Sequence, residues 1–200
     1  DSKELVDAGE TSTAELWSDD WKKGFYPEGN VFCYFGPAWL VNFSMAADTE
    51  GSIGYNGGWG ATEGPQGFFW GGTWICAAAG TDNANLVKDV MKTLCCDKAT
   101  MKKITEDTQD YTNTTSGMNE IASSNFKSDF LGGQNHIKLF AKSAPKISMK
   151  NISSYDQGLN EEFQKAMKDY FDGNYKTYED ALDAFYTKVI VKYPELKKPE

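Results

Sequence analysis

The last third of the chain carries hydrophobic residues at helical spacing. From Asp156 to Phe171 they recur every three or four positions, which predicts one long helix with Gly173 just after its end. Thr177 is followed three residues later by Asp180, an acidic relative of the capping box, and this pair predicts a final helix that runs through Val189. The end of the chain is therefore expected to be helical.

The same spacing predicts shorter helices earlier in the chain. Pro37 has the fixed φ of a first helical turn and is expected to start an apolar helix over residues 38–47. Further helices are expected before Gly9, over about 14–23, from Thr81 or Asp82 past Leu94, from Asp97 past Ile104, near 119–123, and from Gln134 to about Ser143.

Two apolar segments have the pattern of buried strands instead. Val31–Phe35 is a continuous apolar run, and Gly67–Ala79 is a longer run interrupted by Gly71–Gly72. A glycine pair inside a strand marks a bulge or a place where the backbone approaches another group closely. The glycine-rich residues between these runs predict a loop with one short strand at Trp59–Ala61. Strands that alternate with helices predict an α/β chain.

Composition and charge narrow the classes of function. The 200 residues include 20 Lys+Arg and 29 Asp+Glu, which gives a net charge of −9 and argues against a nucleic-acid groove. All the basic residues are lysine, so the chain has no arginine to bind phosphates or carboxylates in bidentate fashion. A neutral small ligand is therefore favoured over an anionic one. With 40% hydrophobic residues the chain can fill a core, yet no apolar run approaches the ~20 residues of a membrane span.

The pattern of the cysteines and of the single histidine does not favour a metal, redox or catalytic site. Cys33 and Cys76 lie in the apolar runs and are expected to pack as small hydrophobic residues, and the adjacent Cys95 and Cys96 lack metal or redox spacing. Free structural thiols are favoured, while disulfides of a secreted chain are the alternative. Any catalytic set with an imidazole would depend on His136, for which a packing or surface role is favoured.

Three patterns occur in order along the chain. They are Val-Phe-Cys-Tyr-Phe-Gly-Pro-Ala-Trp-Leu at 31–40, Gly-Phe-Phe-Trp-Gly-Gly-Thr-Trp-Ile at 67–75, and Tyr-Asp-Gln at 155–157 with Ala-Leu-Asp-Ala-Phe at 181–185. Together they resemble the C-terminal half of the extracellular carbohydrate-binding proteins of ABC importers. The resemblance implies the C-terminal portion of a type II periplasmic-binding-protein-like fold, an α/β fold of two lobes around a hinge.

The resemblance also implies how the chain is divided and what it does. Residues 1–75 and 134–200 would belong to the C-terminal lobe and 76–133 to the N-terminal lobe, with the N-terminal half of the protein outside this sequence. The implied protein is not an enzyme and needs no cofactor or metal. It captures a neutral mono- or oligosaccharide and presents it to ABC permease subunits, outside the cell or in the periplasm, held to the membrane only by a lipid anchor.

A neutral sugar needs aromatic faces for its C–H patches and polar groups for its hydroxyls. Trp39 follows the first predicted strand and its turn, at the kind of strand end where α/β clefts form. Trp70 precedes Gly71 and Gly72, whose missing side chains would let a ligand lie against backbone amides. These four residues match ligand-contacting regions of the family and are the central candidates.

Three further residues, Trp59, Tyr155 and Asp156, are candidates, and Trp59 and Asp156 each have a structural alternative. Trp59 lies on the glycine-rich loop and would cover the cleft or plug the loop onto the core. Tyr155 and Asp156 precede the long helix, where the family faces its ligand, although Asp156 would equally serve as a helix cap. Trp74 lies on the face of Trp70 in a regular strand and on the other face if the glycine pair forms a bulge.

The main alternative function is a carbohydrate-active enzyme or its accessory carbohydrate-binding module. Asp48, Glu50 and Glu63 in the glycine-rich loop would then supply a carboxylate pair, although no spacing singles one out. A binder of another solute, such as a peptide or a polyamine, is a third reading.

Overall fold

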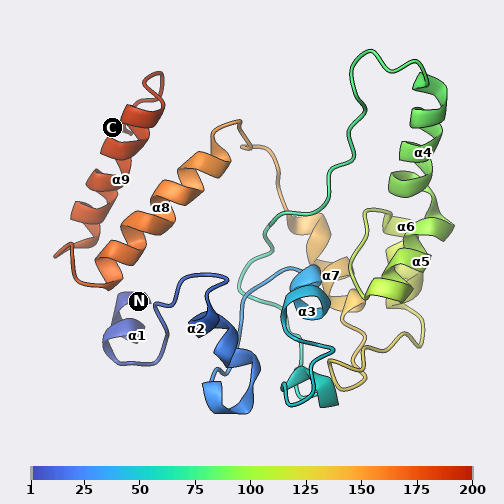
Figure 1. Cartoon of the computed structure of the whole chain (residues 1–200), viewed down its shortest axis with the longest axis horizontal. Helices are drawn as coiled ribbons and strands as arrows, with labels where there is room; N and C mark the ends of the chain where they lie inside the picture. Colours follow the sequence, from blue (N-terminus) through green and yellow to red (C-terminus); the bar gives the residue numbers. More distant parts are fainter. Residues whose placement is uncertain (1, 200) are drawn as a thin grey trace. The chain divides into compact units, whose positions relative to one another are not determined.

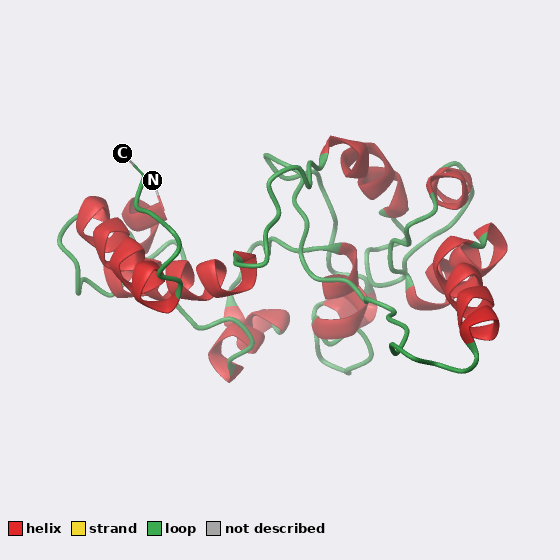
Figure 2. Ribbon diagram, turned by 90° about the horizontal axis from the view of Figure 1, so that it is seen from above, coloured by secondary structure: helices red, strands yellow, loops and turns green. Residues whose placement is uncertain are grey.

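The computed structural model describes residues 2–199 and shows a helical protein (Figure 1). Within this range no sheet is formed, no strand is drawn in Figure 2, and the only bridge joins Ser128 to Gln134 in antiparallel fashion. The expectation of an α/β, periplasmic-binding-protein-like fold is therefore wrong. Asp1 and Glu200, the outer ends of the predicted lobe segments, lie outside the described residues.

Nine α-helices are described, with short 3-10 turns between some of them. The helices are α1 (Ser2–Asp7), α2 (Asp19–Lys22), α3 (Ala38–Ser44), α4 (Ala84–Cys96), α5 (Lys98–Thr108), α6 (Thr115–Ala122), α7 (Ile137–Ser143), α8 (Asp156–Phe171) and α9 (Tyr178–Lys192), and the turns are η1 (Lys23–Phe25), η2 (Pro27–Gly29), η3 (Gly54–Asn56) and η4 (Ala144–Lys146).

The chain forms two compact units. Residues Asp1–Trp21 and Lys150–Glu200 make up the terminal unit, and Lys22–Met149 make up the central unit. The predicted lobes, 1–75 with 134–200 and 76–133, are those of a larger two-lobed protein of which this chain would be one half. The two units seen here therefore do not test that prediction. No helix within residues 2–199 is long and apolar enough to cross a bilayer.

The terminal unit is built on the pair α8 and α9. Phe163 and Phe185 meet edge to face with ring centroids 5.5 Å apart, and Ala181 is fully buried. The predicted capping box is confirmed at the start of α9: the Asp180 amide donates to Thr177 Oγ1 (3.1 Å) and the Thr177 amide donates to the Asp180 carboxylate (3.2 Å). Helical spacing thus predicted α8 and α9 well, because the hydrogen bonds of a helix are local.

The core of the central unit lies between α6 and α7. Met118 and Ile121 on α6 and Ile137 on α7 are almost completely buried against one another. Helix α5 packs against α6, and the predicted cap of α5 is confirmed, since the Thr100 amide donates to the Asp97 carboxylate at 2.8 Å. These three helices pack in sequence order around the buried cluster of the unit.

The predicted helix over 14–23 shrinks to the four residues of α2. Trp17 has a left-handed backbone (φ 70°), which a continuous helix does not allow. The Ser18 hydroxyl then accepts from the Trp21 amide at 3.2 Å, as a cap does at the start of a new helix. The hydrophobic spacing therefore predicted the helix too long, because the Ser18 hydroxyl sets a later start.

The predicted strands do not form. Val31–Phe35 and Gly67–Ala79 are extended, but no neighbouring strand pairs with either within the described residues. Their side chains are consequently open to solvent: Phe32 is 94% exposed and Trp74 is 76% exposed. Cys33 and Cys76, expected to pack, are exposed free thiols.

The short strand expected at Trp59–Ala61 is replaced by a side-chain pairing. The Ala61 amide donates to Gln134 Oε1 at 2.7 Å, and Gln134 Nε2 donates to the Ala61 carbonyl at 2.6 Å. The Gln134 amide therefore binds both polar groups of one residue, as the backbone of a neighbouring strand would. This contact ties the loop to the segment before α7.

Glycines allow the turn η3 to approach the loop before Gln134. A Cβ at Gly54 would overlap the buried ring of Phe130, and a Cβ at Gly57 would lie 2.7 Å from the Asp129 carbonyl oxygen. Gly57 also has a left-handed backbone (φ 72°). The close packing of these two loops depends on the missing side chains.

Candidate functional site

Helix α3 positions Trp39. Its start is set by Pro37, whose backbone is extended (φ −78°, ψ 173°), so the helix begins at the next residue. Ala38 and Leu40 are buried and hold the helix on the central unit, while Trp39 between them is half-buried. The indole therefore lies at the edge of the packed surface.

Trp39 and Trp70 meet although they are 31 residues apart in the sequence. Their rings lie edge to face with centroids 5.6 Å apart, and Trp39 Nε1 donates to the Trp70 carbonyl at 3.2 Å. Phe43, one helical turn after Trp39, lies 6.5 Å from it and is 86% exposed. Trp39, Phe43, Trp70 and Gly71 are called the aromatic site below.

Gly71 and Gly72 have left-handed backbones, with φ of 70° and 98°. A Cβ at Gly71 would lie 3.8 Å from the Trp39 ring, and a Cβ at Gly72 would meet nothing within 4 Å. Two such residues in succession turn the chain, and Trp74 pairs with Phe69 at 6.4 Å between ring centroids. Because no strand forms here, the question of which strand face Trp74 shares with Trp70 does not arise.

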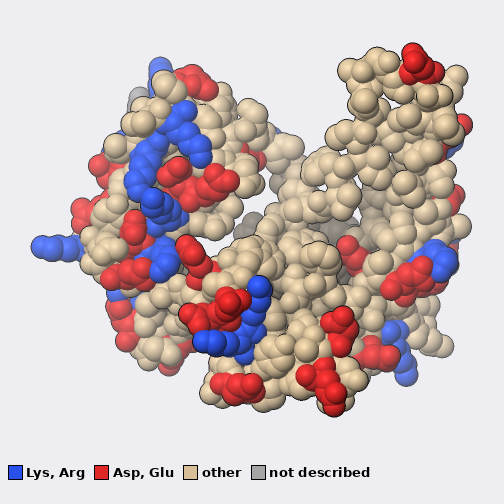
Figure 3. Space-filling view, viewed as in Figure 1, with Lys and Arg blue, Asp and Glu red and all other residues tan. Residues whose placement is uncertain are grey.

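The aromatic site lies in an uncharged part of the sequence. No charged residue occurs over 29–47 or over 64–81. In the view of Figure 3, the surface over the extended chain that leads to α4 carries almost no blue or red. The polar groups of these segments include the backbone groups of Gly71 and Gly72. The exposed side-chain amide of Asn42 is another, and it donates to the Thr108 carbonyl at 2.9 Å. Such a surface offers hydrogen bonds without a formal charge.

Trp59 lies in a separate aromatic cluster. Its ring is 5.9 Å from Tyr34, which is itself 5.2 Å from the buried Phe25. Burial raises the pKa of the Tyr34 hydroxyl. Trp59 Nε1 is buried and has no hydrogen-bond partner within residues 2–199. These contacts indicate that Trp59 packs its loop against the core.

Tyr155 and Asp156 belong to the terminal unit, whereas the other candidates belong to the central unit. The Tyr155 hydroxyl donates to Glu195 at 2.8 Å, and its ring lies 5.1 Å from Tyr193. Asp156 begins α8 and accepts from the Ser153 hydroxyl at 2.6 Å, a hydrogen bond that lowers the pKa of its carboxyl. Both residues therefore have structural partners within the terminal unit.

The carboxylates of the glycine-rich loop do not form an acid–base pair. Glu63 binds Lys142 at 2.6 Å, and this hydrogen bond lowers the pKa of the Glu63 carboxyl, whereas a general acid needs a raised one. Asp48 and Glu50 are exposed. No group of three His, Cys, Asp or Glu side chains within residues 2–199 is arranged to hold a metal ion.

His136 packs inside the central unit. It is fully buried between Phe126 and Phe140, with ring centroids about 6 Å away, and its Nε2 lies 2.7 Å from the Gln109 carbonyl oxygen. Burial lowers the pKa of this imidazole below its ordinary value. Of the packing or surface role favoured from the sequence, the structure shows packing.

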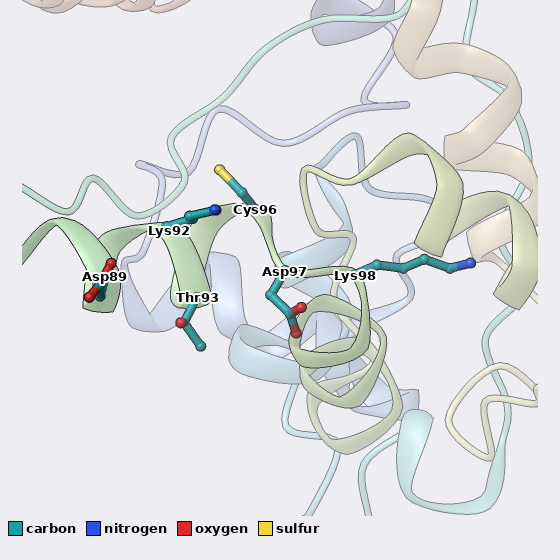
Figure 4. Close-up of a pocket in the computed structure, with 6 residues that line it drawn as sticks. All are labelled: Asp89, Lys92, Thr93, Cys96, Asp97 and Lys98. Atoms are coloured by element: carbon teal, nitrogen blue, oxygen red, sulfur yellow. The ribbon is translucent and has the colours of Figure 1, made fainter.

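Two surface hollows are lined by residues outside the aromatic site. One of about 380 Å³ lies at the junction of α4 and α5, and Figure 4 shows its side chains pointing to different sides instead of converging; they are Asp89, Lys92, Thr93, Cys96, Asp97 and Lys98. The other, of about 400 Å³, is lined by residues of α8 and α9, among them Glu162 and Lys192. Neither contains an aromatic side chain or a predicted site residue.

The sequence identified two of the three rings of the aromatic site. Phe43 was missed, although it follows Trp39 by four residues on a predicted helix, a spacing that brings side chains together. Comparison of the chain with protein-family models, with curated proteins and with solved structures finds no match.

Proposed function

We propose that this chain binds a neutral mono- or oligosaccharide at the aromatic site and does not transform it chemically. The observation that carries the proposal is the meeting of Trp39 and Trp70 next to Gly71, in two segments without charged residues, with Phe43 exposed beside them. Aromatic rings cover the C–H face of a sugar, and the nearby backbone groups bind its hydroxyls. A ligand with a formal charge would find no counterion within these segments.

The role of this binding in the cell rests on the resemblance of the segments 31–40 and 67–75. It favours capture of the sugar outside the cell, by a protein held through a lipid anchor, for delivery to the permease subunits of an ABC importer. The helical fold removes closure of two α/β lobes from this proposal. What remains is recognition by aromatic side chains of the central unit.

The test is a titration of the full chain with neutral saccharides of one to six units, such as glucose, cellobiose and maltohexaose. Isothermal calorimetry and tryptophan fluorescence follow binding, and an assay of new reducing ends follows turnover. Phe43→Ala is the most informative variant, because an 86% exposed ring contributes little to folding. It is expected to weaken binding by about 1 to 3 kcal/mol, the scale of an aromatic contact in a binding site.

Phe32→Ala is the matched control. Phe32 is 94% exposed and lies in the same uncharged stretch, but it is not part of the aromatic site. Binding that Phe43→Ala and Trp39→Ala weaken and Phe32→Ala leaves unchanged supports the proposal. Absence of binding to any saccharide, or equal loss with Phe32→Ala, refutes it, and release of new reducing ends would identify a carbohydrate-active enzyme instead.

A further inference from the structure

The segment Thr73–Ala79 leads into α4 without a partner. All of its residues are exposed, and Figures 1 and 2 both show this part of the chain running alone before it enters the helix. Among the described residues, the one backbone hydrogen bond that it makes is from the Thr81 amide to the Ala78 carbonyl, at 3.3 Å. An extended backbone with free donors and acceptors is a template for another strand.

The side chains of this segment favour a strand as its partner. Trp74 and Ile75 are 76% and 37% exposed, and no charged residue occurs from 64 to 81. Edge strands that stay single usually carry Lys, Pro or a bulge, and Thr73–Ala79 has none of these. A second strand paired with this segment would form hydrogen bonds with its free backbone N–H and C=O groups and would also cover its apolar side chains.

The sequence of the segment is complementary to itself. In an antiparallel pair of two copies centred on Cys76, Trp74 lies opposite Ala78 and Ile75 lies opposite Ala77. Thr73 then faces Ala79. Every large side chain therefore meets a small one, which leaves room for it on the same face of the pair.

Charge does not oppose this pairing locally. Each copy has a net charge of −9, so two chains repel at long range, but the residues that would meet lie in the uncharged stretch 64–81. The paired strands would span about 23 Å, since a strand rises about 3.3 Å per residue. This contact is smaller than a standard interface, so the association is weak and depends on concentration.

We propose that two copies of this chain associate through an antiparallel pair of Thr73–Ala79 segments, with Cys76 of one copy facing Cys76 of the other at the twofold axis. The association is independent of sugar binding, because Trp39 and Phe43 take no part in it.

Cysteine cross-linking tests the register. One protein keeps Cys76 alone, with Cys33, Cys95 and Cys96 changed to serine, and its matched control keeps only Cys33, which is also exposed. Diamide oxidises two thiols to one disulfide and takes up their two electrons and two protons. Directly opposed residues of an antiparallel pair lie within the Cα distance that a disulfide spans. The Cys76 protein is expected to form covalent dimers about tenfold faster or more, because pairing raises the effective thiol concentration.

Sedimentation of the reduced chain tests the contact without any cross-link. The mass is expected to rise from 22.2 kDa towards twice that value as the concentration increases from about 1 μM to a few hundred μM. Ile75→Lys is expected to abolish the rise, because it places two lysines at the pair. Leu86→Lys on α4, where the side chain is 64% exposed, is the control and should leave the rise unchanged.

Each result decides the proposal. A doubled mass that Ile75→Lys abolishes, together with rapid Cys76 cross-linking, supports it. A single-chain mass at every concentration overturns it, as does association that Ile75→Lys leaves intact. Equal cross-linking rates for the Cys76 and Cys33 proteins would also overturn it, because they would show random collision.

Discussion

Replacement of Gly54 by alanine is expected to destabilise the central unit. The added Cβ would lie 2.5 Å from Phe130 Cζ and still nearer to Cδ2 and Cε2 of the same ring. Carbon atoms in contact are normally about 3.5 to 4 Å apart, so the ring would have to move by more than ~1 Å. Phe130 is 4% exposed and is enclosed by the packed unit, which limits this movement.

The magnitude follows from two opposed effects. Overpacking of a buried site costs about 1 to 3 kcal/mol. Gly54 does not have a left-handed backbone, so alanine fits its conformation and restricts the unfolded chain, which returns about 0.4 to 1 kcal/mol. The expected net loss in the free energy of unfolding is about 1 to 2 kcal/mol.

Urea unfolding followed by tryptophan fluorescence measures this loss. In a Trp17→Phe, Trp21→Phe background the four remaining tryptophans, Trp39, Trp59, Trp70 and Trp74, all lie in the central unit, so the signal reports that unit alone. Gly64→Ala is the control, because a Cβ there would meet nothing within 4 Å and the backbone is not left-handed. It should leave stability unchanged or raise it slightly.

A double-mutant cycle identifies the cause. Phe130→Leu removes part of the ring, so Gly54→Ala should be less harmful in that background, with a coupling of about 1 kcal/mol. The reasoning fails if Gly54→Ala and Gly64→Ala have the same stability. It also fails if the loss caused by Gly54→Ala is as large in the Phe130→Leu background as it is beside the native phenylalanine.

Three further predictions concern caps, loop attachment and pH. Thr177→Ala removes the capping box of α9 and should lower the stability of the terminal unit by about 1 kcal/mol in urea unfolding followed by circular dichroism. Gln134→Leu removes both side-chain hydrogen bonds to Ala61 and should destabilise the central unit by about 1 to 3 kcal/mol, whereas loss of less than ~0.5 kcal/mol would show that water replaces the amide. Burial lowers the pKa of His136 in the folded state. The stability that the buried neutral imidazole contributes is therefore complete above its ordinary pKa of about 6.5, and it is lost as the pH falls from there towards the lower pKa of the folded state. The stability difference between the native chain and His136→Gln should therefore shrink from about pH 7.5 to about pH 5.5, and a constant difference would contradict the assignment.

Local hydrogen bonds explain which elements the sequence predicted. The capped helices α5 and α9 and the long α8 were recognised because their side-chain spacing and caps act within a few residues. The strands at Val31–Phe35 and Gly67–Ala79 were predicted wrongly. Their composition suits a sheet, but a strand requires a partner backbone that no local pattern specifies, and no segment of the described chain provides one.

The candidate site was predictable to a similar extent. Trp39, Trp70 and Gly71 were chosen from the sequence and lie together, because a turn and a glycine pair are local signals. Their direct contact was not predicted, since it joins residues 31 positions apart. Trp59 was chosen for its place on the glycine-rich loop but packs against Tyr34, a tertiary neighbour that the sequence alone does not show. Asp156 was chosen from the family resemblance but accepts a hydrogen bond from the nearby Ser153 hydroxyl.

The pairing of Gln134 with Ala61 separates a stable part of the central unit from a part that opens easily. Before Ala61 the chain is held by close loop packing, and after it the extended residues have few backbone hydrogen bonds until α4. Amide hydrogen exchange should therefore be slow at Ala61 and fast over 72–79, although neither lies in a helix. Residues 72–79, which lack backbone partners within the described chain apart from the Thr81–Ala78 hydrogen bond, can therefore change conformation while α5, α6 and α7 stay folded.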